Sequence, residues 1–362
     1  MGLTMLNDSF YRGKKVLVTG HTGFKGAWLS IWLQSMGAEV FGFALDPISE
    51  NCVFSTSRIG DLITDVRGDV RNFQQLKDLF LAYNPEIVFH LAAQPLVLES
   101  YRNPLSTIEV NVQGSCNVLE AARYCSSVRS VVMVTTDKCY ENREWIWGYR
   151  ETDAMGGHDP YSASKGAAEL IISSYYRSFF KEKSQTGVAS VRAGNVIGGG
   201  DWCDNRIVPD IFRAIIHDTT VKVRNPQSIR PWQHVLEPIG AYLLIAQRMW
   251  ENPHDISGAW NIGPFSSHHK SVKDLVDEII KSCGRGQWES EFSHQNAHEA
   301  NLLSLDITKA QRLLGWSPVL SFHETVELTC NWYLAEPNTD FLRLALDQIK
   351  HYSTKWSFQP GN

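Results

Sequence analysis

The chain has 362 residues, of which 43% are hydrophobic and 20% charged, so it is long enough for one large globular domain or two ordinary ones. Its formal net charge of −5 argues against the strongly basic surface that binds nucleic acid or an anionic membrane. No run of 18 apolar residues and no apolar core of a signal peptide occurs, so we expect no membrane span.

The cysteines and histidines give no sign of a disulfide framework or a metal site. The seven cysteines are odd in number and scattered, and no CxxC pair occurs. The twelve histidines include no HxH or HExxH spacing. We therefore predict reduced thiols, a cytoplasmic location and no bound metal.

Short apolar runs alternate with helical patterns along the first half of the chain. Strands are expected at 14–20, 38–46, 85–93, 130–136 and 187–196, and helices at 23–37, 72–84, 111–126 and 161–183. The expected strands are continuous apolar runs, which is typical of a parallel sheet covered on both faces. This pattern predicts a doubly wound α/β domain. After residue 196 the pattern loosens, which indicates a smaller C-terminal portion.

A glycine-rich segment, TGHTGFKG, joins the first expected strand to the first expected helix. Gly20 allows a tight turn, Gly23 lets a pyrophosphate approach the backbone, and Gly26 lets the helix pack closely on the strand. The helix start points unpaired N–H groups at the phosphates. An ordinary glycine-rich turn is the alternative, but the place between strand and helix favours a Rossmann-type dinucleotide site. Its expected residues are Gly20, His21, Thr22, Gly23, Phe24, Lys25 and Gly26. The bulk of His21 is expected to crowd the pyrophosphate.

The segments that follow indicate which dinucleotide binds. Asp46 closes the second expected strand, where a carboxylate accepts hydrogen bonds from the adenosine ribose. An acid there repels a 2′-phosphate, so NAD is favoured over NADP. Asp69 and Val70 are expected near the adenine. The strand end in HLAAQP is expected to face the cofactor with Leu91, Ala92 and Ala93.

Tyr161 and Lys165 lie four residues apart in an expected helix, so they share one face. A neighbouring ammonium and a positive nicotinamide ring favour the phenolate and bring the tyrosine pKa towards working pH. Alone, the pair could be a surface tyrosine beside a lysine. Downstream of a dinucleotide loop it predicts an acid–base pair, which a non-catalytic NAD-binding protein would not need.

Over most of its length the chain resembles the extended short-chain dehydrogenase/reductase superfamily. The resemblance rests on TGHTGFKG, HLAAQP, NVQGSCNVLEA, TTDK, YSASK, RAGNVIGGGDW, RPWQHVLEP, WNIGP and LDITKAQRLLGWSP. Within the superfamily it is similar to the nucleotide-sugar 4,6-dehydratases, and TTDKCYEN and ALDP favour those that act on CDP-D-glucose. The resemblance implies an NAD-dependent hydro-lyase of deoxysugar biosynthesis, of the kind that serves lipopolysaccharide O-antigen.

The resemblance also assigns roles to the end of the strand at 130–136. Tyr161 would take the proton of the sugar C4 hydroxyl, and Thr136 would hydrogen-bond the same oxygen. Asp137 would protonate the departing C6 hydroxyl. Lys138 would remove the C5 proton or stabilise the enolate, although related dehydratases commonly carry Asp-Glu here. A strand-end cap and a 4-epimerase, which usually has small residues in this place, are the alternatives.

The substrate is expected along the later segments. Asn195, Arg206 and Arg230 are the expected partners of the diphosphate, because an arginine fork matches a phosphate in two hydrogen bonds. Gln94 and Asn111 would face the sugar or order water near Tyr161. No residue identifies the nucleotide base, so CDP rests on the overall resemblance, and dTDP, GDP and UDP stay open.

The expected fold is therefore α/β, a Rossmann-type doubly wound parallel sheet with a smaller mixed α/β C-terminal substrate-binding domain. The expected NAD-binding domain spans 12–194, with a returning segment near 232–265. The nucleotide-sugar-binding domain would comprise 195–231 and 266–362. The stretches 111–125 and 167–180 carry more apolar surface than one sheet face needs, which predicts an isologous helical interface and a homodimer or homotetramer.

Overall fold

The computed structural model describes residues 6–182, 184–291 and 302–357. Seven strands form a parallel sheet in the order β11-β6-β5-β4-β1-β2-β3. Their bounds are β1 Lys15–Thr19, β2 Glu39–Ala44, β3 Thr64–Arg67, β4 Ile87–His90, β5 Ser130–Val134, β6 Gly187–Arg192 and β11 Gly258–Asn261. This order confirms the predicted doubly wound sheet.

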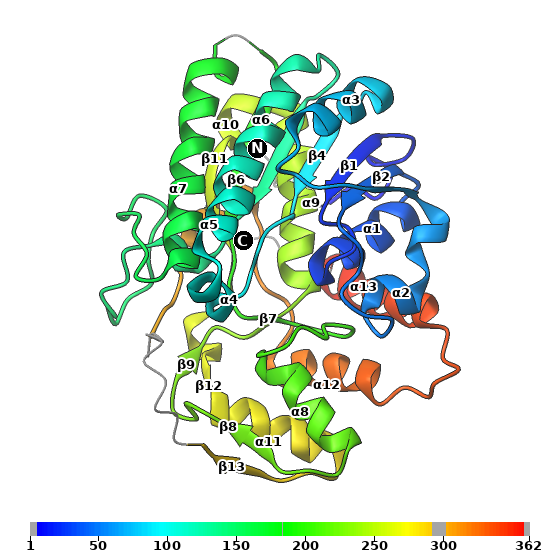
Figure 1. Ribbon diagram of the computed structural model, residues 1–362, viewed down its shortest axis with the longest axis vertical. Helices are drawn as coiled ribbons and strands as arrows, with labels where there is room; N and C mark the ends of the chain where they lie inside the picture. The colour runs from blue at the N-terminus through cyan, green and yellow to red at the C-terminus, as the bar shows by residue number, and fades with distance from the viewer. Residues whose placement is uncertain (1–5, 183, 292–301, 358–362) are drawn as a thin grey trace.

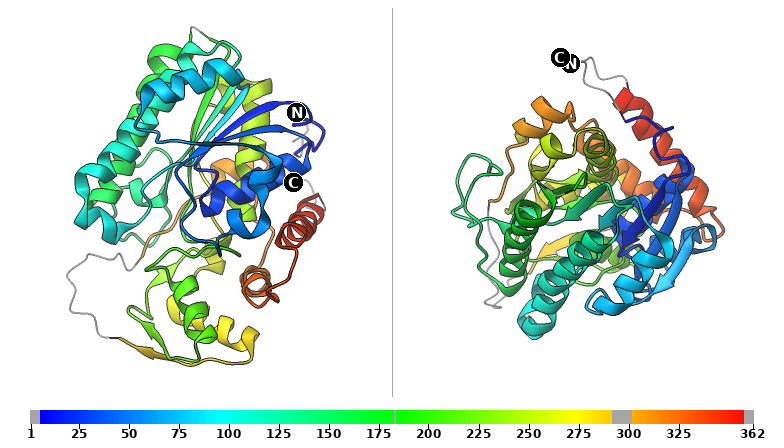
Figure 2. Two further views of the ribbon diagram at one scale, coloured as in Figure 1. Left: turned by 45° about the vertical axis from the view of Figure 1, so that its right-hand side comes forward. Right: turned by 90° about the horizontal axis from the view of Figure 1, so that it is seen from above.

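Helices cover both faces of the sheet (Figures 1 and 2). One face packs against α3 (Phe73–Tyr83), α6 (Gly114–Tyr124) and α7 (Pro160–Tyr175), and the other against α1 (Phe24–Ser35) and α9 (Leu236–Glu251). Alternate residues of β1 point to opposite faces: Val16 and Val18 join the core under α1 and α9, and Leu17 joins the core under α3 and α6. Burial on both sides explains why the strands are continuous apolar runs.

Edge strand β3 was not predicted. It carries Thr64, Asp65 and Arg67 and is only partly buried, so it lacks the apolar run that marks the central strands. The shorter helical elements on this part of the chain are α2 Val53–Ser57, η1 Ile59–Leu62, α4 Val97–Arg102, α5 Pro104–Ile108, η2 Glu109–Gln113, η3 Asp137–Cys139 and η4 Tyr176–Phe180.

A smaller unit with its own core lies beyond the carboxyl ends of the sheet strands (Figure 1). Three two-stranded sheets pair β7 with β10, β8 with β13, and β9 with β12. Their bounds are β7 Val196–Ile197, β8 Val221–Val223, β9 Ile229–Arg230, β10 Gln233–His234, β12 Lys270–Ser271 and β13 Trp288–Ser290. Its helices are α8 Ile207–Ile216, η5 Ser266–His268, α11 Val272–Cys283 and α12 Phe322–Tyr333. This arrangement confirms the expected mixed α/β C-terminal portion.

The chain passes between the two parts more than once. After β10, helix α9, the short α10 (Pro253–Ile256) and β11 return to the large sheet. The turn η6 (Ala310–Leu314) joins the same core, and α13 (Phe341–Ser357) packs against α1 and α2 rather than the small core. Residues 292–301 and 358–362 lie outside the described residues, and the division at 194, 232 and 265 stays a prediction.

Candidate active site

The glycine loop has the close contacts that its sequence requires. Gly20 has φ +77°, and a Cβ there would lie 2.6 Å from the backbone nitrogen of Ala92. A Cβ at Gly26 would overlap the carbonyl of Gly20. Gly23 is exposed and caps α1, so its side of the loop is open to solvent. The residues present therefore fit a pyrophosphate on the exposed side of the loop.

His21 lies differently from the prediction. Its ring is fully buried against Gly42 of β2, and Nε2 lies 2.8 Å from Oδ1 of Asp65. Burial lowers the pKa of this imidazole despite the neighbouring carboxylate. Because the ring lies beneath the loop, the expectation that it crowds the pyrophosphate is wrong. The Thr22 hydroxyl donates to the Leu45 carbonyl at 2.9 Å and ties the loop to the end of β2.

Asp46 is exposed beyond the end of β2, as expected of a ribose ligand. Its Oδ1 lies 3.6 Å from Nε of Arg67, a neighbour that the sequence analysis did not consider. Arg67 also pairs with Asp65 at 2.8 Å, so two carboxylates offset its charge. Further along the edge, Asp69 accepts hydrogen bonds from Arg71, which lower the Asp69 pKa, and Val70 is buried against Gly114.

The residues after β4 line the same edge of the sheet. Leu91, Ala92 and Ala93 are partly exposed, and the Leu91 N–H donates to the Thr19 carbonyl at 3.0 Å. Gln94 and Asn111 bond to each other: the Gln94 N–H donates to Asn111 Oδ1 at 2.9 Å. Asn111 also donates to Ser164 Oγ at 2.9 Å, which connects the pair to α7.

Strand β5 ends just before the predicted catalytic residues Thr136, Asp137 and Lys138. Thr136 caps the short turn η3, and its hydroxyl donates to Asp137 Oδ1 at 2.9 Å. Asp137 is 1% exposed, and its Oδ2 has no hydrogen-bond partner among the described residues. A Cβ at position 194 would overlap this carboxylate, so Gly194 provides its space. Lys138, by contrast, is exposed.

Helix α7 places Tyr161 and Lys165 beside the end of β5. Asp159 accepts from the Ser162 N–H as N-cap, and Pro160 opens the helix, so Tyr161 lies in the first turn. The Thr136 hydroxyl lies near enough to the Tyr161 phenol to act on its pKa, and Lys165 Nζ donates to the Val134 carbonyl at 3.4 Å. Tyr161 and Lys165 therefore lie next to the end of β5, and their catalytic roles stay predictions.

The pKa of Tyr161 differs from the expectation. Burial, with a smaller contribution from the Asp137 charge, raises it to about 12, although Thr136 and Arg206 act in the opposite direction. Burial also lowers the pKa of Lys165 to about 8. A positive nicotinamide ring next to the phenol would favour the phenolate, so cofactor binding would lower the tyrosine pKa.

Two predicted residues, Lys25 and Arg206, lie near these groups, together with Asp201, which was not predicted. Burial, together with the charges of Arg206 and Lys165, lowers the pKa of Lys25 to about 8, while Asp137 and Asp201 act in the opposite direction. Arg206 pairs with Asp201 at 2.6 Å and influences Tyr161. Arg206 therefore lies near Tyr161. Its partner Asp201 was not predicted, because it lies in an irregular loop without a recognisable sequence pattern.

The remaining predicted substrate residues lie further along the chain. Asn195 has φ +50° and follows β6, and its carbonyl accepts from the Gln233 N–H at 3.2 Å. Arg230 is nearly buried in β9, where its Nη1 donates to the Ile229 carbonyl at 3.0 Å. Asn195 thus lies on the sheet edge, and Arg230 lies in the small unit.

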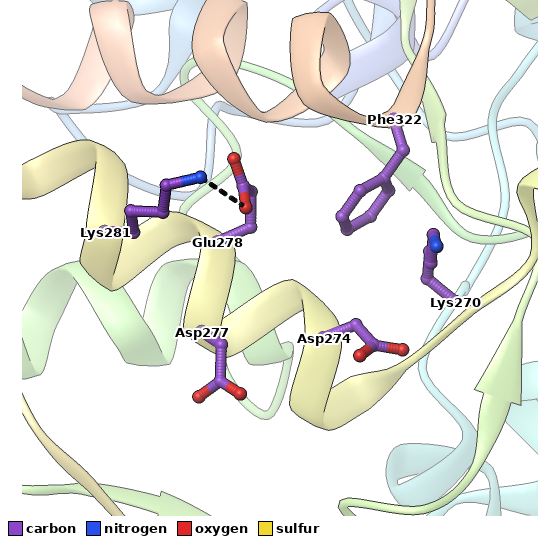
Figure 3. A pocket seen from close by; sticks show the side chains of 6 residues that line it. All are labelled: Lys270, Asp274, Asp277, Glu278, Lys281 and Phe322. Carbon is purple, nitrogen blue, oxygen red and sulfur yellow. Dashed lines mark ion pairs between the residues drawn. The ribbon is translucent and has the colours of Figure 1, made fainter.

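A separate hollow of about 260 Å³ on the small unit is lined by none of these groups. Its lining residues are Lys270, Asp274, Asp277, Glu278, Lys281 and Phe322 (Figure 3). Its carboxylates are already engaged: Asp274 accepts from the N-cap Ser271 of α11, Asp277 pairs with Lys273, and Glu278 pairs with His323. Within the described ranges, no three His, Cys, Asp or Glu side chains are grouped to hold a metal ion. The candidate active site is therefore the edge formed by the glycine loop, β5 and α7.

The comparisons with known proteins agree with this geometry. The family described as GDP-mannose 4,6 dehydratase matches residues 17–329. The CDP-glucose 4,6-dehydratase of Salmonella typhimurium is 47% identical over 335 residues, covering 91% of this chain and 93% of that protein. The epimerase Mth375 of Methanothermobacter thermautotrophicus has a TM-score of 0.79 at 25% identity, covering 93% of this chain and 96% of that one. A dTDP-glucose 4,6-dehydratase of Streptomyces venezuelae, solved with NAD, has a TM-score of 0.75 at 22% identity, covering 88% and 96%, and shows the shared fold.

Proposed function

The chain belongs to the GDP-mannose 4,6-dehydratase family, and from this premise we propose that it converts CDP-D-glucose to CDP-4-keto-6-deoxy-D-glucose and water. It is an NAD-dependent hydro-lyase of the nucleotide-sugar 4,6-dehydratase type. The preference for a CDP sugar is supported by the 47% identical relative that carries this activity in its name. The observation that carries the proposal is the grouping of Tyr161, Thr136 and Asp137 at one strand end, where Thr136 donates to Asp137 at 2.9 Å and both residues act on the pKa of Tyr161.

The residues at the sheet edge would perform the first half of the reaction. Tyr161 takes the proton of the C4 hydroxyl, and Thr136 holds the same oxygen through its hydroxyl. Lys165 lies one helical turn from Tyr161 and would hold the nicotinamide ribose. A bound NAD would supply the redox chemistry, as acceptor of the C4 hydride and its later donor to C6. The resulting 4-ketone makes the C5 hydrogen acidic.

Elimination would follow on the other side of the sugar. Asp137, as the carboxylic acid, gives its proton to the C6 hydroxyl, which leaves as water. Lys138 removes the C5 proton if its amine is neutral, or stabilises the enolate by its charge. A proton then returns to C5 from this same side of the sugar. Asp137 Oδ2 has no hydrogen-bond partner within the described structure and is buried beside Gly194, so it is the carboxyl oxygen that is not committed to Thr136.

The nucleotide end of the substrate would extend from the sheet edge towards the small unit. Asn195 and Arg206 would meet the diphosphate near the sheet, with Arg230 further out. Gln94 and Asn111 would order the sugar or water beside Tyr161. The Arg206–Asp201 pair at 2.6 Å would hold this guanidinium in place before the diphosphate arrives.

We propose that the protein assembles as a homodimer or homotetramer through α5, α6 and α7. Large apolar side chains are exposed on these helices, namely Leu105, Ile108, Tyr124 and Leu170. Leu105 and Leu170 are 76% and 62% exposed, and α5 and α7 pack together. Sedimentation should give at least a dimer mass, and Leu105→Glu with Leu170→Glu should give a monomer. A monomeric wild-type protein at micromolar concentration would contradict this interface.

The cellular setting is also a proposal. All seven cysteines are free thiols, which supports the cytoplasm. None of the helices within the described residues has the length and apolar character needed to span a bilayer. The product would serve deoxysugar biosynthesis for surface polysaccharide. We expect no nucleic-acid or membrane partner and no metal.

A panel of four nucleotide-glucoses tests the substrate. CDP-, dTDP-, GDP- and UDP-glucose are each incubated with enzyme and NAD, and products are identified by mass spectrometry. We expect a product lighter by one water from CDP-glucose at the highest rate. A 4-epimer of unchanged mass would indicate an epimerase, and a faster reaction with dTDP- or GDP-glucose would replace the proposed substrate.

A further inference from the structure

A buried ion pair lies behind the candidate active site. Glu169 is on α7, four residues after Lys165, and is 4% exposed. Its Oε2 accepts from Arg192 Nη2 and from Ser190 Oγ, each at 2.7 Å. Its Oε1 accepts from Thr135 Oγ1 at 2.5 Å. Burial alone would raise the pKa of Glu169, but Arg192 and the two hydroxyls lower it overall, so the carboxylate is charged.

Arg192, at the end of β6, extends this network to a second part of the catalytic segment. Its Nη1 donates to the Tyr140 hydroxyl at 2.7 Å and to the Glu151 carbonyl at 3.1 Å. The guanidinium also lies 4.9 Å from the centre of the Tyr140 ring. The Tyr140 hydroxyl in turn donates to Asn261 Oδ1 at 2.7 Å, at the end of β11.

Thr135 and Tyr140 stand on either side of the segment 136–139 that carries Thr136, Asp137 and Lys138. One flank is therefore bonded to Glu169 and the other to Arg192, and these two residues are paired with each other. We infer that the Glu169–Arg192 pair holds the catalytic segment from both ends and so positions Thr136 and Asp137 against Tyr161. Glu169 and Arg192 are positioning residues in this account, since they act through Thr135 and Tyr140.

A contribution to folding stability does not by itself explain a buried pair such as Glu169–Arg192. Removing two charges from water costs free energy that their attraction often only offsets, so apolar side chains of similar volume are frequently as stabilising. Directed hydrogen bonds, by contrast, fix the flanks of a short turn. A misplacement of about 1 Å in a reacting group costs on the order of 10²-fold in rate. The main contribution of the network is therefore to position the reacting groups.

The inference rests on the proposed dehydratase activity. It is tested by substituting Thr135 and Tyr140, the two residues that flank the catalytic segment. Thr135→Val removes the hydroxyl at nearly constant volume, whereas Thr135→Ser keeps it. We expect Thr135→Val to lower kcat by about 10–10²-fold with KM unchanged, and Thr135→Ser to restore most of the rate. Tyr140→Phe should show the same split between kcat and KM. Glu237→Gln is a control at a buried polar position outside this network, because Glu237 bonds to Val319, Leu320 and Tyr352 instead.

Hydrogen exchange measured on peptides spanning 135–141 provides a readout that does not depend on activity. Exchange there should accelerate in Thr135→Val and Tyr140→Phe, but not in Thr135→Ser or Glu237→Gln. Unchanged exchange in the first two variants would overturn the inference, even if the wild type proved to have another activity. Equal loss of kcat in Thr135→Ser and Thr135→Val would also overturn it, since the methyl group rather than the hydrogen bond would then matter. A wild type without dehydratase activity would contradict the proposed function separately.

Discussion

Thr136 and Asp137 are neighbours in the chain and partners in a hydrogen bond, with Oγ1 of Thr136 2.9 Å from Oδ1 of Asp137. The bond leaves the second carboxylate oxygen buried and, within the described residues, without a partner. A buried polar atom without a partner costs free energy and calls for an explanation, which the proposed role of this carboxyl group in elimination would supply.

Asp137→Asn should therefore slow elimination more than oxidation. The amide keeps the shape of the side chain but is a poor proton donor to the C6 hydroxyl, and general acid catalysis contributes about 10²–10⁴-fold. In a single turnover, absorbance of the reduced nicotinamide should build up in the variant and remain low in the wild type. A wild-type rate without that build-up would leave Asp137 only as a strand-end cap.

Tyr161→Phe should suppress turnover while NAD binding remains nearly intact, because only the phenolic oxygen is lost. The expected loss of rate is again about 10²–10⁴-fold. Titration of the variant with NAD, followed by tryptophan fluorescence, provides the binding control. Normal turnover would refute the assignment of this tyrosine as the base for the C4 hydroxyl.

NAD should bind the apo-protein more tightly than NADP, because Asp46 repels a 2′-phosphate. The ion pair between Asp46 and Arg67 also predicts how a substitution of Asp46 changes cofactor preference. Asp46→Ala would remove one of the two carboxylates that flank Arg67 and leave a guanidinium near the 2′ position. The variant should gain affinity for NADP relative to NAD. An unchanged ratio of the two dissociation constants would show that the adenosine ribose lies elsewhere.

Glu237 should give the protein a pH-dependent stability. Burial raises its pKa from 4.5 to about 7, so the folded state favours the protonated acid. The stability that this proton contributes is complete below about pH 4.5 and is lost as the pH rises through about 7. The difference in free energy of unfolding between wild type and Glu237→Gln should therefore fall between pH 5 and 8, measured by urea unfolding.

Glu324→Gln is a suitable control for that series. Burial acts to raise the pKa of Glu324, but Lys355 and Ser321 lower it overall to about 2, so this carboxylate stays charged across the same pH range. Its difference from the wild type should be constant from pH 5 to 8. A constant difference for Glu237→Gln as well would mean that its carboxyl does not titrate in this window.

The parts of the fold that depend on local pattern were predictable. Gly20 and Gly26 could be assigned because only glycine tolerates such close backbone contacts, and the buried strands show as apolar runs. Edge strand β3 was missed because it is half exposed and polar. The return of α13 to α1 depends on contacts across more than 300 residues, for which the sequence carries no local signal.

The same limit applies to the site. Tyr161 and Lys165 could be paired because they lie on one helix face, but the raised pKa of Tyr161 follows from burial that no spacing reveals. The pairing of Glu169 with Arg192 joins α7 to β6. Its only sequence signal is an acid in an otherwise apolar stretch of α7, one turn beyond Lys165.

The fate of one hydrogen tests the central claim most directly. CDP-D-glucose labelled with deuterium at C4 is incubated with the enzyme and unlabelled NAD, and the product is examined by NMR and mass spectrometry. A 4,6-dehydratase predicts deuterium at C6 of a 4-keto-6-deoxy product, with a solvent hydrogen at C5. Deuterium retained at C4 would identify an epimerase, and deuterium on released reduced cofactor would identify a simple dehydrogenase. Either result would contradict the account.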